Sequence, residues 1–128
     1  MQTITTATAA LALGIEAKAL DNLLNSGANE LLPPGERGRS RRIPLDVLEL
    51  ITLVLLLKRD LGVPVTRAVE IAQAIHRAPH GEIRLGSLAV LRFDVARLRD
   101  VLQRAIADAL ETVVPPRRGR PPARTRPS

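Results

Sequence analysis

Apolar positions in the first quarter of the chain recur at helical spacing in two short blocks. Residues 6–13 form a mildly apolar block that a threonine at its start can cap and that Gly14 ends. Residues 16–25 place four apolar side chains on one face, and Gly27 follows just past the end. Those side chains are Ala19, Leu20, Leu23 and Leu24. Two short helices joined by a tight glycine-containing turn predict a helix-turn-helix unit.

The next segment, ANELLPPGERGRSRRIP, has the pattern of a basic hairpin. Residues 31–32 and 42–43 are expected to pair as two short strands. The glycines and prolines between them favour a turn-rich tip that is not helical. A basic hairpin directly after a helix-turn-helix is typical of a DNA-binding wing.

Two longer helices are predicted in the middle of the chain. Residues 45–61 are mostly apolar, with Asp46 and Glu49 in the first turn and two basic side chains in the last turn before Gly62. These charges complement the helix dipole at both ends. A further helix is predicted for residues 65–78, where apolar side chains again recur at helical spacing.

Beyond Pro79 the pattern changes to a strand-like alternation. EIRL and LAVLRF alternate around Gly86-Ser87, which predicts a small β-hairpin. Asp94 is then expected to cap a last helix whose apolar side chains recur every three or four residues. They are Val95, Leu98, Leu102, Ile106, Ala109 and Val113. This stripe could pack on the domain's own core or form a short coiled coil with a second copy, and the large apolar surface of the region favours dimerisation.

Composition excludes most routes to catalysis. The chain has no cysteine, and His76 and His80 have no acidic partner at metal-ligand spacing on a shared face. Neither paired carboxylates, a Ser-His-Asp set nor a glycine-rich phosphate loop is evident. We therefore expect a protein that is not an enzyme and that has no metal site and no cofactor. Because Phe93 is its only aromatic residue apart from the histidines, base stacking as in single-strand binders is excluded as well.

The net charge of +6 is concentrated at one end of the chain. Residues 115–128 carry five arginines and no acidic residue, whereas residues 1–114 hold fourteen basic and thirteen acidic residues. Within this nearly neutral body, four arginines cluster at positions 37–42. The clustering points to an anionic partner more than the total charge does.

Neither of the two most apolar segments of the chain indicates a membrane protein. The start, MQTITTATAALALGIEA, has no basic residue before Lys18 and does not fit a secretory signal. The apolar run at residues 45–57 is too short to cross a bilayer. The sequence predicts a soluble, cytoplasmic protein.

Residues 5–75 resemble the winged helix-turn-helix of the MerR family of bacterial regulators. In that family the first short helix ends with an alanine, followed by any three residues and then by Gly-Val. The corresponding stretch here is Ala10-Leu-Ala-Leu-Gly14-Ile15. The leucine expected six residues past the glycine is Leu20, and the glycine that closes the helix is Gly27. The proline-then-arginine wing corresponds to residues 33–42, the family's Leu-Gly helix end to residues 61–62, and its following helix to residues 65–75.

The chain also departs from the family pattern. An arginine and aromatic residues usually follow the helix leucine, whereas this chain has Asp21, Asn22 and Leu23. Ile43 replaces the usual aromatic residue of the wing. The long coiled coil and cysteine metal sensor of the family have no counterpart here, so metal sensing is not implied.

The resemblance implies a recognition helix at residues 16–25. Its Lys18, Asn22 and Asn25 could approach base edges in a major groove, whereas Glu16 and Asp21 would repel phosphates. The alternative is that this helix presents only a solvated face. The wing arginines suit phosphate oxygens, which fix orientation without specifying sequence. They are Arg37, Arg39, Arg41 and Arg42.

The tail, PPRRGRPPARTRPS, contains a motif of its own. Arg118-Gly119-Arg120-Pro121, preceded by Arg117, resembles the core of an AT-hook. In such a core the glycine lets the backbone lie at the floor of a narrow minor groove while the arginines enter it. The competing interpretation is a disordered solubilising end that assists association only through its charge.

Together these patterns predict a mostly α protein with three parts. Residues 1–78 are a MerR-like winged helix-turn-helix with a small β-wing, residues 79–114 a β-hairpin and a helix that can self-associate, and residues 115–128 a disordered, basic, AT-hook-like tail. The predicted function is sequence-specific binding of double-stranded DNA by a homodimeric bacterial transcription regulator. Such a protein would act at the nucleoid in the cytoplasm. A phage-type excisionase is a variant of this prediction.

Two alternatives remain open. One is an architectural, nucleoid-associated binder with little sequence preference. The other is a protein-interaction module such as an antitoxin or an adaptor, which the acidic residues of the recognition helix favour.

Overall fold

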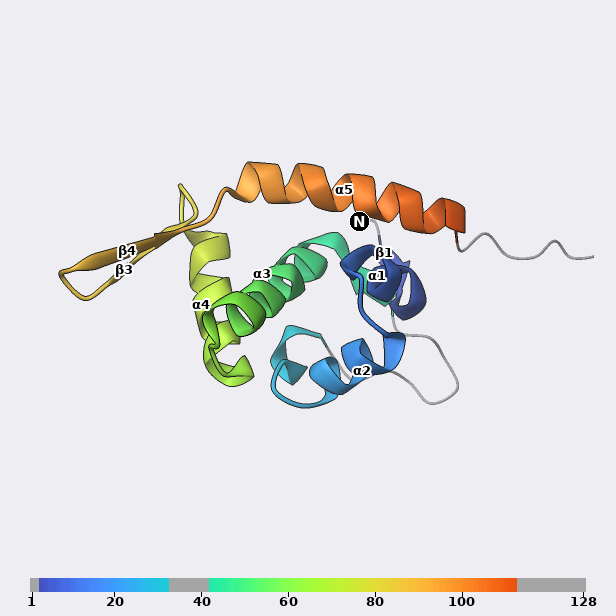
Figure 1. Ribbon diagram of the computed structural model, residues 1–128, viewed down its shortest axis with the longest axis horizontal. Coiled ribbons are helices and arrows are strands. Elements are labelled where there is room, and N and C mark those ends of the chain that lie inside the picture. The colour runs from blue at the N-terminus through green and yellow to red at the C-terminus, as the bar shows by residue number, and fades with distance from the viewer. Residues whose placement is uncertain (1–2, 33–41, 113–128) are drawn as a thin grey trace, which may run out of the picture.

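The computed structural model describes residues 3–32 and 42–112, and over these residues the chain is mostly helical, as predicted. The elements are β1 (Thr3–Thr5), α1 (Thr6–Leu13), α2 (Ala17–Asn25), the 3-10 helix η1 (Asn29–Leu31), β2 (Arg42–Pro44), α3 (Leu45–Leu61), α4 (Val65–Arg77), β3 (Glu82–Leu85), β4 (Ala89–Arg92) and α5 (Val95–Thr112). Helix α3 crosses the middle of the molecule, with α4 beside it; α2 lies on one side of α3 and α5 on the other (Figure 1).

The ends of α1 and α3 follow from local chemistry and confirm the predictions made for them. The Thr5 hydroxyl caps α1 by accepting a hydrogen bond from the Thr8 amide at 3.2 Å. Gly14 and Gly62 end α1 and α3 with φ of +73° and +67°, a left-handed conformation that glycine adopts without a steric penalty. Each helix therefore stops where its sequence signal lies.

Strand β2 pairs with a different strand from the one predicted. It runs antiparallel to β1, so that Ile4 lies opposite Ile43 and both side chains are buried. The expected pairing of β2 with residues 31–32 is therefore wrong, because Leu31 belongs to η1. Both leucines at these positions are buried in one core, whereas a strand would send adjacent side chains to opposite faces. The predicted hairpin tip, residues 33–41, lies outside the described residues.

The core is built around α3, as its apolar sequence predicts. Its buried side chains are Leu48, Ile51, Leu53, Val54 and Leu57. Helix α4 faces α3 with a stripe that includes two alanines, whose small side chains allow the helices to approach closely. The stripe consists of Ala68, Val69, Ala72 and Ile75. Helices α1, α2 and α5 pack against this same core, so all described helices share it.

The predicted second hairpin is present and projects away from the helices (Figure 1). Strands β3 and β4 pair antiparallel through a turn at residues 86–88, and Leu88 at its tip is 96% exposed. The base of the hairpin is closed by a hydrogen bond of 2.8 Å from the Phe93 amide to the Gly81 carbonyl. Asp94 then caps α5 by accepting a bond from the Arg97 amide at 3.0 Å, as predicted.

We expect Gly81→Ala to lower the free energy of unfolding by about 2–4 kcal/mol, against about 1 kcal/mol for Gly86→Ala. Both glycines have φ near +65° (+66° and +65°), so both substitutions incur the same backbone strain. Only at position 81 does a Cβ meet other atoms, namely the Phe93 carbonyl oxygen and Val95 Cγ2, the latter at 2.9 Å. Urea denaturation monitored by circular dichroism measures both; equal losses would contradict the close contact at the hairpin base.

Candidate nucleic-acid interface

Helix α2 presents a polar face to solvent and an apolar face to the core. Leu20, Leu23 and Leu24 are buried. Lys18 and Asn22 are exposed one turn apart, and Asn25 continues the same exposed face at the next turn. The three residues predicted to approach base edges therefore share one accessible face. Ala19, which the sequence pattern had assigned to the apolar face, is exposed instead, so that prediction is wrong.

The chemistry of this face is mixed. Amide side chains such as those of Asn22 and Asn25 both donate and accept hydrogen bonds, which is the capacity that reading base edges requires. Glu16 is exposed at the N-terminus of α2, beside Lys18, and Asp21 is partly buried. The face therefore lacks the excess of positive charge that phosphate contacts need.

The orientation of α2 is fixed at both of its ends. At the start, the Ile15 amide donates to the Ala10 carbonyl at 3.0 Å across the turn that joins α1 and α2. After its end, Gly27 lies so close to α4 that a Cβ there would stand 2.9 Å from Val65 Cβ and closer still to Cγ1. The turn after α2 is therefore packed against the start of α4, which holds the exposed face rigidly on the body.

Among the predicted wing arginines, only Arg42 lies within the described residues. Its side chain is exposed, and its Nε and Nη2 groups donate to the Thr3 hydroxyl and carbonyl oxygens at 3.2 and 3.3 Å. A guanidinium has five N–H donors, so this anchoring leaves donors for a phosphate while holding the group in place. Arg37, Arg39 and Arg41 lie outside the described residues.

The tail and the end of the predicted dimerisation stripe also lie outside the described residues; this applies to Arg117, Arg118, Gly119, Arg120 and Val113.

The rest of the stripe on α5 packs within the chain. Leu102 and Ile106 belong to the core cluster, Ala109 is buried, and Val95 and Leu98 are partly buried against the core. The sequence left two alternatives for the stripe, packing on the domain's own core or a coiled coil with a second copy. In the structure the stripe packs on the core. A coiled coil through the same side chains would require α5 to leave the core.

An ion cluster that the sequence did not predict joins three helices. Glu49 of α3 accepts from His76 of α4 at 2.8 Å, through Oε1, and from Arg99 of α5 at 3.0 Å, through Oε2. Only 12% of the Glu49 side chain is exposed. Of the two acidic residues expected in the first turn of α3, only Asp46 lies there. Sequence spacing could not reveal the cluster, because the partners of Glu49 lie 27 and 50 residues away in the chain.

Comparison with known proteins assigns no family: no family model, no curated protein and no solved structure matches the chain. In the part of the chain that the structure describes, no helix combines the length and apolar character needed to span a membrane. Over the same residues, no three His, Asp or Glu side chains are grouped so that they could hold a metal ion.

Proposed function

We propose that this chain is a sequence-specific double-stranded DNA-binding protein that regulates bacterial transcription, with a MerR-like winged helix-turn-helix as its reading unit. The observation that supports the proposal best is the face of α2: Lys18, Asn22 and Asn25 are exposed together on a short helix whose opposite side is buried. A helix of this kind inserts into the major groove and reads base edges. A protein with this function works at the nucleoid, in the cytoplasm.

The phosphate contacts in this proposal come from arginines outside α2. Arg42 is exposed and held on β1, and the other wing arginines follow residue 36 in the same segment. Five further arginines lie in the tail, where the AT-hook-like core takes a neighbouring minor groove. In this proposal, α2 supplies the specificity of DNA binding and the arginines supply most of its affinity.

Asn22→Ala tests the reading role of α2. We expect it to weaken binding to a duplex from the protein's own promoter by about tenfold to a hundredfold, the value of one good base contact, and to leave binding to a shuffled duplex unchanged. The matched control is Gln103→Ala, which removes an exposed amide from α5 on the other side of the body (Figure 1). Fluorescence anisotropy at constant salt measures the affinities of the wild-type chain and of both variants for both duplexes.

Either of two results would contradict the proposed reading role. If the wild-type chain binds both duplexes equally, the protein is an architectural binder in which α2 contributes little. If Asn22→Ala and Gln103→Ala weaken promoter binding equally, the face of α2 is not the reading surface. A chain that binds neither duplex and co-purifies with a stable protein partner would identify an interaction module, for which Glu16 and Asp21 are suitable contacts.

A homodimer is part of this proposal, because helix-turn-helix regulators read two half-sites about one helical turn apart. Its interface is assigned to the β3–β4 hairpin, since the α5 stripe is already covered. Leu85 lies opposite Ala89 on one face of the hairpin and is 45% exposed, and Leu88 at the tip is 96% exposed. A two-stranded hairpin is marginally stable in water by itself, so a second hairpin that covers these side chains would stabilise both copies.

A further inference from the structure

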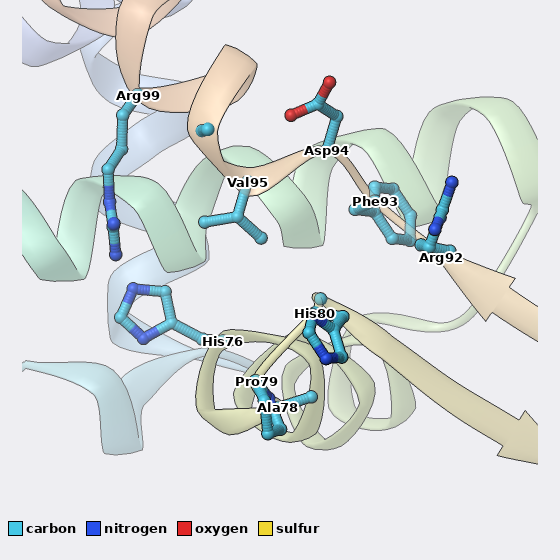
Figure 2. Close-up of a pocket in the computed structure, with 11 residues that line it drawn as sticks. His76, Ala78, Pro79, His80, Arg92, Phe93, Asp94, Val95 and Arg99 are labelled. Atoms are coloured by element: carbon cyan, nitrogen blue, oxygen red, sulfur yellow. The ribbon is translucent and has the colours of Figure 1, made fainter.

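A groove with a volume of about 580 Å³ lies where the end of α4, the base of the hairpin and the start of α5 meet. This volume lies within the range of small-molecule sites, about 300–1,000 Å³. Figure 2 shows Val95 facing His76 and His80 across the groove, and Arg99 descending from α5 toward the His76 ring. Three separate elements therefore contribute side chains to one concave surface.

The polar wall of this groove carries more donors than acceptors. Arg92 and His80 are exposed, and neither forms an ion pair or a side-chain hydrogen bond with any residue that the structure describes. Arg99 uses its Nε for Glu49, which leaves its Nη donors for a ligand. The groove thus presents two guanidinium groups that can each hold an anion through paired hydrogen bonds.

The acidic groups near the groove do not cancel this charge. Glu49 is largely buried and already bound to His76 and Arg99. Asp94 accepts the capping bond of α5, and its carboxylate points away from the two histidines (Figure 2). A carboxylate or phosphate group would therefore supply the acceptors that the wall lacks.

The remaining wall is apolar and includes the only aromatic side chain of the protein other than the histidines. Phe93, Pro79 and Val95 line the groove beside the cationic groups. An aromatic ring or a comparable flat apolar body can pack against such a surface. The two walls together select a ligand with one anionic end and one apolar end.

We propose that this groove binds a small organic anion, with a carboxylate or phosphate held by Arg92 and an aromatic body packed against the neighbouring Phe93 (Figure 2). This site is separate from the proposed DNA-reading face and goes beyond the proposed function. Because its walls come from α4, the hairpin and α5, a bound anion would fix the hairpin relative to the helical body. A ligand that fixes the hairpin in this way would act as an effector of the protein.

The test uses the full chain without DNA and two probes, phenyl phosphate and benzoate. Two-dimensional amide NMR follows each titration, since it distinguishes the groove from the arginine-rich tail. We expect both probes to shift the amides of residues 81 and 93, with dissociation constants on the order of 1 mM for ligands of this size. Inorganic phosphate and benzyl alcohol, which each supply one half of the ligand, are expected to bind at least about tenfold more weakly.

Arg92→Gln and its matched control Arg84→Gln assign the site. Both arginines are exposed on the hairpin, but only Arg92 lines the groove. We expect Arg92→Gln to weaken phenyl phosphate binding about tenfold or more and Arg84→Gln to leave it unchanged. Shifts confined to the tail, equal effects of the two substitutions, or inorganic phosphate binding as tightly as phenyl phosphate would each overturn the proposal. None of these results depends on whether the protein binds DNA.

Discussion

Replacing the five tail arginines with glutamine is expected to make the salt dependence of DNA binding much less steep. Each phosphate that a protein neutralises contributes about −0.9 to the slope of log affinity against log salt, so five arginines contribute up to about −4.5. Between about 50 and 200 mM salt, that contribution alone amounts to a factor of about 500 in affinity. The positions to be changed are Arg117, Arg118, Arg120, Arg124 and Arg126.

A second variant, with lysine at the same five positions, separates the effect of the positive charge on DNA binding from the effect of the planar guanidinium group. Lysine keeps the charge but lacks the planar guanidinium, so we expect the slope to stay and any preference for A·T-rich duplexes to fall. Fluorescence anisotropy over a salt series, with A·T-rich and G·C-rich duplexes, provides both readouts. An unchanged slope in the glutamine variant would show that the tail makes no phosphate contacts, and an A·T preference that survives in the lysine variant would argue against the AT-hook.

Leu88→Ser is expected to weaken self-association by a factor of about 100 or more. Burying a leucine side chain contributes about 1.5–3 kcal/mol, and a two-fold interface contains the residue twice, so the loss is about 3–6 kcal/mol per dimer. Because Leu88 is 96% exposed in the single chain, the substitution leaves the fold of each copy intact. Sedimentation equilibrium over a range of protein concentrations measures the dissociation constant.

Leu110→Ser is the control for this experiment. Leu110 is 47% exposed near the end of α5, far from the hairpin (Figure 1), so its replacement is expected to leave the dimer unchanged. If Leu110→Ser dissociates the dimer and Leu88→Ser does not, the interface lies on α5 and not on the hairpin. A wild-type chain that stays monomeric at every concentration would contradict the dimer itself.

The exposed face of α2 could be predicted from the sequence, whereas the groove at the base of the hairpin could not. Lys18, Asn22 and Asn25 could be placed on one exposed face because the intervening leucines define the opposite, apolar face of a short helix. The groove beside His76 could not be predicted, because its walls come from three elements that are not adjacent in the sequence. Periodicity assigns a face to each helix but does not say which faces meet.

The sequence by itself determined the helices and their ends. Gly14 and Gly62 stop α1 and α3, Thr5 and Asp94 cap α1 and α5, and apolar spacing within each segment defines its buried face. These signals act over a few residues and therefore survive without knowledge of the fold.

Only the tertiary structure decided the long-range partners. It paired β2 with β1, turned the α5 stripe onto the chain's own core, and brought Glu49 to Arg99 across 50 residues of sequence. Each of these choices depends on which apolar surface remains uncovered once the helices have packed. That is a property of the assembled core, and no local pattern records it.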